Sequence, residues 1–321
     1  MKYKVLIIGL GAIGMGYDYY SNNKNFIVTH AKAFSLHKGF NLVGGVDTNI
    51  KRATLFKEKY RSFSGDDLAK ALKETSPNVV VISNPTNIHL QTIKTIFKNS
   101  KPEFILCEKP LAYSIDESQE IIDICKKNSS FLYVNYMRRV EPGVIEIKKR
   151  MEIITKSSSF NGVVWYDKGL IHNGSHFSNL LEFWFGKSIS HKIIKRYDSI
   201  NQNDCLIDFQ LNFSMGSITF LVLKNSNYSH HEINIFNKSS CVRYEDSGSR
   251  IIWQGAEKSK DYFDYSILSK EKEIIPNRLN IVQLLVAENI YKILSGELSS
   301  LCNGQEGYET ISTLIKIKNQ I

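Results

Sequence analysis

The chain opens with an apolar run that leads directly into three glycines spaced G-x-G-x-x-G, at positions 9, 11 and 14. Residues 4–8, with the sequence KVLII, have the length and composition of a buried strand. The first glycine permits a tight turn, the second lets backbone approach a pyrophosphate, and the third lets a helix pack close to the sheet. A phosphate would bind the free N–H groups at the positive end of that helix. Glycine triplets also occur in ordinary turns, but the preceding strand favours a dinucleotide site. Its predicted contacts here are Gly9, Gly11, Ala12, Ile13 and Gly14.

A second strand is predicted at residues 40–46, and it ends in Asp47. A carboxylate at that place accepts hydrogen bonds from the ribose 2′-hydroxyl and repels a 2′-phosphate, so it favours NAD over NADP. Asp47 is also a candidate N-cap for the helix that starts near Ile50, and the two roles are compatible. Lys51 and Arg52 leave NADP open as the cofactor.

The segment between the glycines and Asp47 is longer than the usual ~20 residues. The excess is polar and aromatic and covers residues 17–25, so we predict a loop inserted before a helix near His30. Loops over a phosphate site often act as lids or contact the substrate. Tyr17 is therefore a candidate substrate-binding residue.

Composition narrows the class of protein. A chain of 321 residues with 42% hydrophobic and 23% charged residues suits two soluble domains with separate cores. No apolar run approaches the ~20 residues that span a bilayer, and the N-terminus has no signal-peptide pattern. The five cysteines are scattered and include no C-x-x-C, as expected for reduced thiols in a cytoplasmic protein. The net charge of +9 comes from dispersed lysines, so we predict an anionic cofactor or substrate and no nucleic-acid or membrane partner.

Strand and helix patterns alternate through about residue 135. Apolar runs at 79–83, 104–107 and 131–135 predict buried strands, with helices at 90–98 and 114–127. This alternation predicts an α/β fold with a doubly wound parallel sheet, whose ligands bind at the carboxyl ends of the strands. The segments predicted to lie there are 9–14, Asp47, 84–86 and 108–110.

From about residue 158 the strand patterns are short, alternating and closely spaced, and two helices follow at 281–294 and 308–318. Such spacing predicts an α+β domain with a mostly antiparallel open sheet. The predicted division is a dinucleotide-binding Rossmann domain at 1–122 and a substrate-binding and oligomerisation domain at 123–321. The pair His230-His231 is interpreted as an exposed turn.

Together these motifs resemble the glucose–fructose oxidoreductase, inositol dehydrogenase and MocA (Gfo/Idh/MocA) family. The most specific match combines Glu108-Lys109-Pro110 with Gly174-x-His176, and the resemblance covers nearly the whole chain. It implies hydride transfer between a nicotinamide and a carbon bearing a hydroxyl or ketone, usually on a sugar, polyol or sugar nucleotide. It also implies a homodimer or homotetramer. Further predicted cofactor contacts are Asn84, Pro85, Thr86, His89, Glu108 and Lys109.

Lys109 and His176 are the predicted catalytic residues. An ammonium beside the nicotinamide can bind the reacting hydroxyl and stabilise alkoxide character, although lysines at strand ends usually reach solvent. We expect Asn173 or Ser175 to cap a helix that holds His176 in its first turn, where the positive helix end disfavours imidazolium. A histidine that merely packs on an apolar helix is the alternative.

The chain departs from the family around His176. The family commonly has aspartate four residues before the histidine, where this chain has His172, and many members have another three residues after it, where this chain has Asn179. A carboxylate that orients the imidazole is therefore missing. The two histidines have a zinc-like spacing, but without a third ligand we predict no metal. The predicted substrate-binding residues are Tyr17, Lys109, Arg139, His172, Asn173 and His176.

The sequence thus predicts an NAD(P)-dependent oxidoreductase acting on a sugar or nucleotide-linked sugar. The aromatic insert and the basic charge favour a sugar nucleotide or phosphorylated sugar, with a role in surface polysaccharide biosynthesis as a hypothesis. One alternative is an imine or bilin reductase on the same scaffold, in which His176 is dispensable. Another is a cofactor-binding regulator or scaffold that has lost catalysis.

Overall fold

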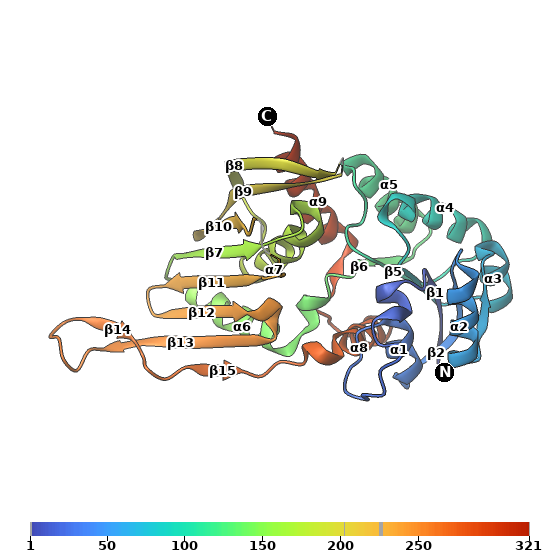
Figure 1. Cartoon of the computed structure of the whole chain (residues 1–321), viewed down its shortest axis with the longest axis horizontal. Helices are drawn as coiled ribbons and strands as arrows, with labels where there is room; N and C mark the ends of the chain where they lie inside the picture. The colour runs from blue at the N-terminus through green and yellow to red at the C-terminus, as the bar shows by residue number, and fades with distance from the viewer. Residues whose placement is uncertain (1, 202, 225–226, 321) are drawn as a thin grey trace. The chain divides into compact units, whose positions relative to one another are not determined.

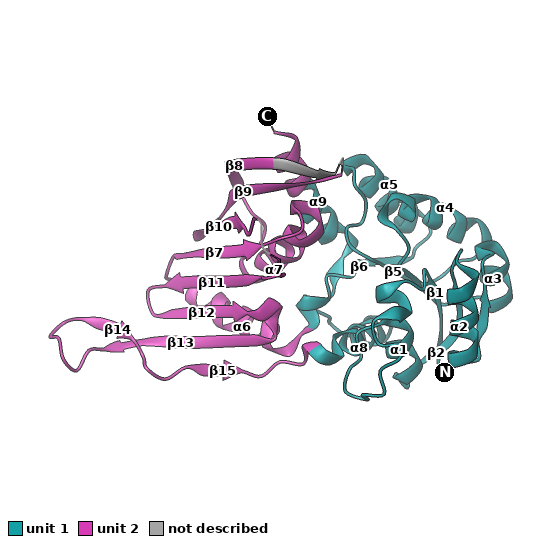
Figure 2. Ribbon diagram, in the orientation of Figure 1, with its two compact units in different colours: residues 1–140, 280–312 teal, residues 141–279, 313–321 magenta. Residues whose placement is uncertain are grey.

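The computed structural model describes residues 2–201, 203–224 and 227–320, and it divides into two compact units (Figure 2). The first unit contains residues 1–140 and 280–312, and the second contains 141–279 and 313–321. This division corrects the predicted boundary after residue 122, which falls inside helix α5 (Ile115–Lys127). The strand that follows α5 pairs with the sheet of the first unit, and the chain returns to that unit after residue 279.

The first unit is built on a seven-stranded sheet in the order β16-β6-β5-β4-β1-β2-β3 (Figure 1). All neighbouring strands are parallel except β16, which runs antiparallel to β6. The predicted doubly wound parallel sheet is confirmed, while β3 and β16 were not predicted. The strands are β1 (Tyr3–Ile8), β2 (Phe40–Val46), β3 (Phe63–Gly65), β4 (Val79–Ile82), β5 (Phe104–Cys107), β6 (Phe131–Val134) and β16 (Cys302–Asn303).

Helices cover both faces of this sheet, since the four residues of β4 are completely buried. On one face, apolar side chains from the strands form a core with Leu72, Ile93 and Ile121 of three successive helices. Elsewhere in the unit α1 packs against α8. The helices are α1 (His30–Leu36), α2 (Ile50–Tyr60), α3 (Leu68–Thr75), α4 (His89–Asn99), α5, α8 (Val282–Leu294) and α9 (Gly304–Asn319), the last with residues in both units. Short turns are η1 (Ala12–Gly16), η2 (Thr86–Ile88), η3 (Met137–Val140) and η6 (Leu279–Ile281).

The second unit is built on a nine-stranded sheet in the order β14-β13-β12-β11-β7-β10-β9-β8, with β15 paired to β13 (Figure 1). Its pairs are antiparallel except β7 with β10, which confirms the predicted mostly antiparallel sheet. The strands are β7 (Phe160–Tyr166), β8 (Ser190–Asn201), β9 (Asp204–Phe213), β10 (Gly216–Val222), β11 (Glu232–Asn237), β12 (Ser240–Glu245), β13 (Arg250–Lys258), β14 (Ser266–Leu268) and β15 (Glu273–Ile275). The helical elements are α6 (Pro142–Ile154), which was not predicted, η4 (Leu170–Gly174), α7 (Ser175–Phe185) and η5 (Asp246–Gly248).

Alternate residues of the second sheet face a buried core. Val164, Phe220 and Ile235 are completely buried on that side. Phe185 of α7 stacks on Phe160 of β7 with ring centroids 3.9 Å apart, so α7 covers this face. None of the helices in the described ranges is long and apolar enough to cross a membrane.

Candidate cofactor and substrate sites

The three glycines of the opening motif have different surroundings. Gly9 has a φ of 92°, and a Cβ there would lie 2.5 Å from the backbone nitrogen of Asn84. A Cβ on Gly14 would lie 2.1 Å from the carbonyl oxygen of Gly9, whereas a Cβ on Gly11 would meet only the Arg52 side chain at 3.9 Å. Gly9 and Gly14 are thus required by the backbone itself. Gly11 borders open space, as expected of the residue that lets a ligand approach.

Asp47 ties the end of β2 to the glycine turn. Its Oδ2 accepts a hydrogen bond from the Leu10 backbone nitrogen at 2.7 Å, and its Oδ1 accepts one from Asn49 at 2.8 Å. Arg52 lies alongside, with Nη1 3.6 Å from Oδ2. The side chain that caps α2 is Asn49, so the alternative reading of Asp47 as that helix's N-cap is wrong.

A cavity of about 510 Å³ lies at the carboxyl ends of β1, β2 and β4. Its lining includes Gly9, Gly11, Asp47, Arg52, Asn84 and Pro85, but not the other predicted cofactor contacts. The buried Oδ1 of Asn84 has no hydrogen-bond partner among the described residues, so it remains able to accept one from a ligand. An open glycine, a carboxylate and an unsatisfied amide around one cavity fit a dinucleotide.

Of the remaining predicted cofactor contacts, Ala12 and Ile13 lie in η1 and Thr86 begins η2. His89 binds the backbone of the loop that contains Asn84. It is completely buried, and its Nε2 donates to the carbonyl oxygen of Asn84 at 3.0 Å. Burial lowers the pKa of His89, although bonds from the ring to the carbonyls of Leu111 and Asn84 oppose this. The structure thus places His89 as a support of the Asn84 loop, outside the cavity lining.

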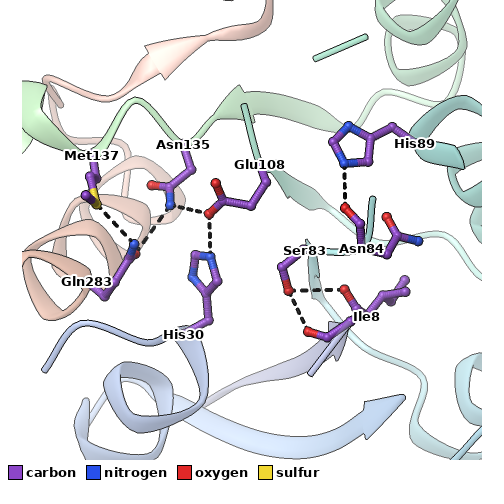
Figure 3. A network of polar contacts seen from close by, with 10 residues as sticks. Ile8, His30, Ser83, Asn84, His89, Glu108, Asn135, Met137 and Gln283 are labelled. Carbon is purple, nitrogen blue, oxygen red and sulfur yellow. Dashed lines mark hydrogen bonds and ion pairs between the residues drawn. The ribbon is translucent and has the colours of Figure 1, made fainter. Parts of the chain in front are cut away.

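Glu108 and Lys109 follow β5 at the same edge of the sheet. Oε1 of Glu108 lies 2.8 Å from Nε2 of His30 and 2.6 Å from Nδ2 of Asn135 (Figure 3). Burial alone would raise the pKa of the Glu108 carboxyl, but hydrogen bonds from His30 and Asn135 and the charge on Lys109 outweigh it and lower that pKa. The Glu108 carboxylate is thus hydrogen-bonded by side chains of the protein itself. The peptide bond between Lys109 and Pro110 is cis.

In the second unit, the predicted catalytic helix begins differently from the expectation. The π-helical turn η4 runs directly into α7, and neither Asn173 nor Ser175 caps α7 through its side chain. His172 is exposed in η4, and His176 is half-buried in the first turn of α7. Asn179, which stands where many family members have aspartate, is buried.

Two carboxylates that the sequence reasoning missed hold η4 in place. Asp204, at the start of β9, accepts hydrogen bonds from the backbone nitrogens of Ile171 and His172, both at 2.8 Å. Asp167, after β7, accepts one from Nδ2 of Asn173 at 2.8 Å. Two carboxylates that are distant in sequence thus hold the turn that precedes His176.

Asp167 also pairs with a histidine. Its Oδ1 lies 2.7 Å from Nε2 of His231, whose Nδ1 is 2.8 Å from the hydroxyl of Ser247. His231 is 9% exposed, so the interpretation of residues 230–231 as an exposed turn is wrong for His231. Burial raises the pKa of Asp167, but hydrogen bonds from Ser229, His231 and Asn173 outweigh it and the net pKa is lowered.

Besides Lys109, two predicted substrate contacts lie in the first unit. Arg139 is 5% exposed, and its Nη2 donates to Oε1 of Glu306 at 2.7 Å, so its charge is already paired. Tyr17 is exposed at the start of the insert. The insert is anchored by the completely buried Asp18, which accepts hydrogen bonds from the backbone of Val28 and from both the backbone and hydroxyl of Thr29.

The parallel sheet, the glycine turn and the cavity at the strand ends define the first unit as a dinucleotide-binding α/β domain. Residues 3–136 match the Gfo/Idh/MocA model, described as an oxidoreductase family with an NAD-binding Rossmann fold. Over these residues the chain is similar to that family, which agrees with the predicted resemblance and with the predicted NAD-binding fold of the first unit.

The sequence relatives match less than half of the chain. Inositol 2-dehydrogenase from Rubrobacter xylanophilus is 26% identical over 144 residues, which are 44% of this chain and 38% of that protein. The chain spans about two fifths of the length of that relative.

Solved structures match almost the whole chain. The WlbA dehydrogenase from Bordetella pertussis, in complex with NADH and UDP-GlcNAcA, has a TM-score of 0.74 at 18% identity over 99% of this chain and 94% of that one. UDP-N-acetylglucosamine 3-dehydrogenase GnnA from Acidithiobacillus ferrooxidans has a TM-score of 0.75 at 12% identity over 99% and 97%. At these identities the likeness shows that the two-domain fold is shared.

Proposed function

We propose that the protein is an NAD-dependent oxidoreductase that transfers a hydride between the nicotinamide and a secondary carbinol or ketone of a sugar or nucleotide-linked sugar. The observation that carries this proposal is the cavity at the strand ends, where Gly11, Asp47 and Asn84 meet. The family of residues 3–136 supports it.

Two side chains have proposed chemical roles. A bound NAD⁺ would supply the hydride acceptor for the carbinol carbon. Lys109 hydrogen-bonds the carbinol oxygen and stabilises its negative charge as the C–H bond breaks. His176 takes the hydroxyl proton, so the substrate loses a hydride and a proton and leaves as a ketone. In ketone reduction the same two residues act in the opposite sense.

A nucleotide-linked sugar is the substrate class that we favour. WlbA binds UDP-GlcNAcA, and GnnA is named for a UDP-sugar. The net charge of +9 and the exposed His172 suit an anionic substrate. We further propose that the protein works in the cytoplasm as a homodimer or homotetramer and takes part in surface polysaccharide biosynthesis.

The test is reduction of NAD⁺ by a panel of UDP-sugars, sugar phosphates and free sugars, followed by mass spectrometry of the product. Lys109→Ala is expected to lower kcat by about 10³-fold while NADH binding, followed by fluorescence, stays within a few-fold. Lys101→Ala, an exposed lysine before β5, is the matched control and should retain full activity.

Each alternative predicts a different result. Turnover of uncharged sugars alone would contradict the nucleotide-sugar assignment. An imine or bilin reductase would keep its activity in His176→Asn. A scaffold would bind NADH and turn over nothing on the panel.

A further inference from the structure

A buried histidine that belongs to no motif of the sequence contacts the residue next to Lys109. His30 is the first residue of α1, is 1% exposed, and places Nε2 2.8 Å from Oε1 of Glu108. The side chain of Glu108 is itself only 14% exposed. A carboxylate so far from water requires partners of this kind.

The same oxygen of Glu108 has a second partner from another strand. Asn135, directly after β6, donates from Nδ2 at 2.6 Å and is 2% exposed. Gln283 of α8 extends the network, with its Oε1 3.5 Å from Asn135 Nδ2 and its Nε2 3.5 Å from the sulfur of Met137 (Figure 3). Elements far apart in the sequence thus fix one carboxylate.

The charges around Glu108 favour its ionised form. His30 from α1 and Lys109 from the same loop lower the pKa of Glu108. The negative charge of Glu108 in turn acts to raise the pKa values of His89 in α4 and Cys107 in β5. Because electrostatic coupling is mutual, a fixed negative charge on Glu108 stabilises the ammonium of Lys109.

We propose that His30, Glu108 and Asn135 form a positioning set that holds the Glu108 carboxylate, and with it the adjoining residue Lys109, in place. This inference rests on the proposed function in assigning Lys109 to catalysis. His30 and Asn135 are positioning residues: they act on the substrate only through Glu108 and Lys109.

The chain offers a matched control in the same unit. His37 ends α1, and its Nε2 lies 2.9 Å from Oε2 of Glu288 on α8. This is also a histidine–glutamate pair that joins α1 to another element, but neither partner adjoins a residue with a proposed catalytic role. His37→Leu therefore measures what the loss of such a pair costs the fold alone.

The first experiment needs no substrate. Competitive acetylation of the full-length protein across pH, quantified by mass spectrometry, reports the protonation and reactivity of Lys109. Glu108→Gln is expected to move the midpoint of Lys109 labelling down by about one pH unit. His30→Leu should change the labelling rate of Lys109 at least threefold, whereas His37→Leu should leave it unchanged.

The second experiment measures steady-state kinetics on the best substrate of the panel. His30→Leu should lower kcat about tenfold with the KM for NAD⁺ within twofold. His30→Gln, which keeps an N–H donor for Glu108, should recover most of the loss even if His30→Leu folds poorly. Equal losses in His30→Leu and His37→Leu, or wild-type labelling of Lys109 in Glu108→Gln, would overturn the inference. If the wild-type protein turned over no substrate, the proposed function would fail while labelling still decided the role of His30.

Discussion

The two sheets of this protein place functional side chains in opposite ways. In the first unit a parallel sheet is covered on both faces, and the candidate cofactor residues follow the ends of β1, β2 and β4, each close in sequence to its strand. In the second unit the turn η4 is held by Asp167 and Asp204, and Asp167 is bound in turn by His231; these residues lie at the ends of three different strands. A local sequence motif is therefore enough to predict the cofactor site of the first unit. The contacts around η4 in the second unit form only when the sheet has folded.

The difference has a physical origin. In a parallel sheet every crossover brings the chain back in the same direction, so successive strand ends meet at one edge. In an antiparallel sheet neighbouring strands end at opposite edges, and which side chains meet depends on register. His231 reaches Asp167 because Glu232 of β11 pairs with Trp165 of β7.

The largest effect is expected from the glycine turn, where backbone and ligand requirements can be separated. Gly14→Ala would place a Cβ 2.1 Å from the carbonyl oxygen of Gly9, and we expect it to lower the free energy of unfolding by about 3 kcal/mol. Gly11→Ala meets only a side chain at 3.9 Å, so it should fold normally and weaken NADH binding at least tenfold. Urea denaturation and fluorescence titration measure the two quantities.

Gly255→Ala on β13 is the control, since nothing lies within 4 Å of its Cβ. It should change neither quantity. Normal NADH binding by Gly11→Ala would show that the ligand does not approach the turn at this glycine.

Sequence alone was sufficient for most of the first unit because its information is local. The strands, the glycine turn and Asp47 follow from hydrophobic runs and the residues that end them. The sequence could not show that Glu108 is bound by His30 and Asn135, nor that Arg139 is paired with Glu306, since these contacts join distant segments. The return of residues 280–312 to the first unit was missed for the same reason.

In the second unit, the sequence predicted the kind of sheet and the helix that carries His176, but not the surroundings of η4. Asp204 lies 33 residues from Ile171, and no pattern links the two. Residues 230–231 were interpreted as an exposed turn, but the pairing of β11 with β7 brings His231 to Asp167. The absence of a carboxylate that orients His176, which the neighbouring sequence positions indicate, stays a prediction.

The next largest effect is expected at the base of η4. Asp204→Ala would leave the backbone nitrogens of Ile171 and His172 without their carboxylate acceptor, which should lower the free energy of unfolding by about 2 kcal/mol. Asp261→Ala, at an exposed position beyond β13, should change it by less than about 0.5 kcal/mol. Equal denaturation curves for the two variants would show that η4 does not depend on Asp204.

A smaller effect is expected in the pH dependence of stability. The pKa of Glu108 is lowered by folding, so its contribution is present above its unfolded pKa of about 4.3 and is lost as pH falls through the folded value. The stability difference between wild type and Glu108→Gln should therefore shrink as the pH is lowered from 6 to 3, by about 1.4 kcal/mol for each unit of pKa shift.

Glu141, just before α6, should show the opposite pH dependence of stability, because its pKa is raised. Burial raises its pKa, so ionisation opposes folding and the penalty is relieved as pH falls. Relative to Glu141→Gln, the wild-type protein should gain stability between pH 6 and pH 3. The difference in free energy of unfolding between wild type and variant should change with pH in opposite directions for Glu108→Gln and Glu141→Gln. The same pH dependence for both variants would contradict the two pKa shifts.

The smallest effect on stability is expected on the open face of the second sheet, which has no counterpart in the covered sheet of the first unit. Trp165 and Phe236 share this face because Trp165 pairs with Glu232 and Phe236 with Asn161, and they are 37% and 47% exposed. Trp165→Glu with Phe236→Glu should change the free energy of unfolding of a monomer by less than about 0.5 kcal/mol. If this face joins the copies of the predicted homodimer or homotetramer, the same variant should sediment as a monomer, while Ile153→Glu on α6 sediments like the wild type. An unchanged sedimentation coefficient in the double variant would move the interface elsewhere, and a monomeric wild type would contradict the predicted oligomer.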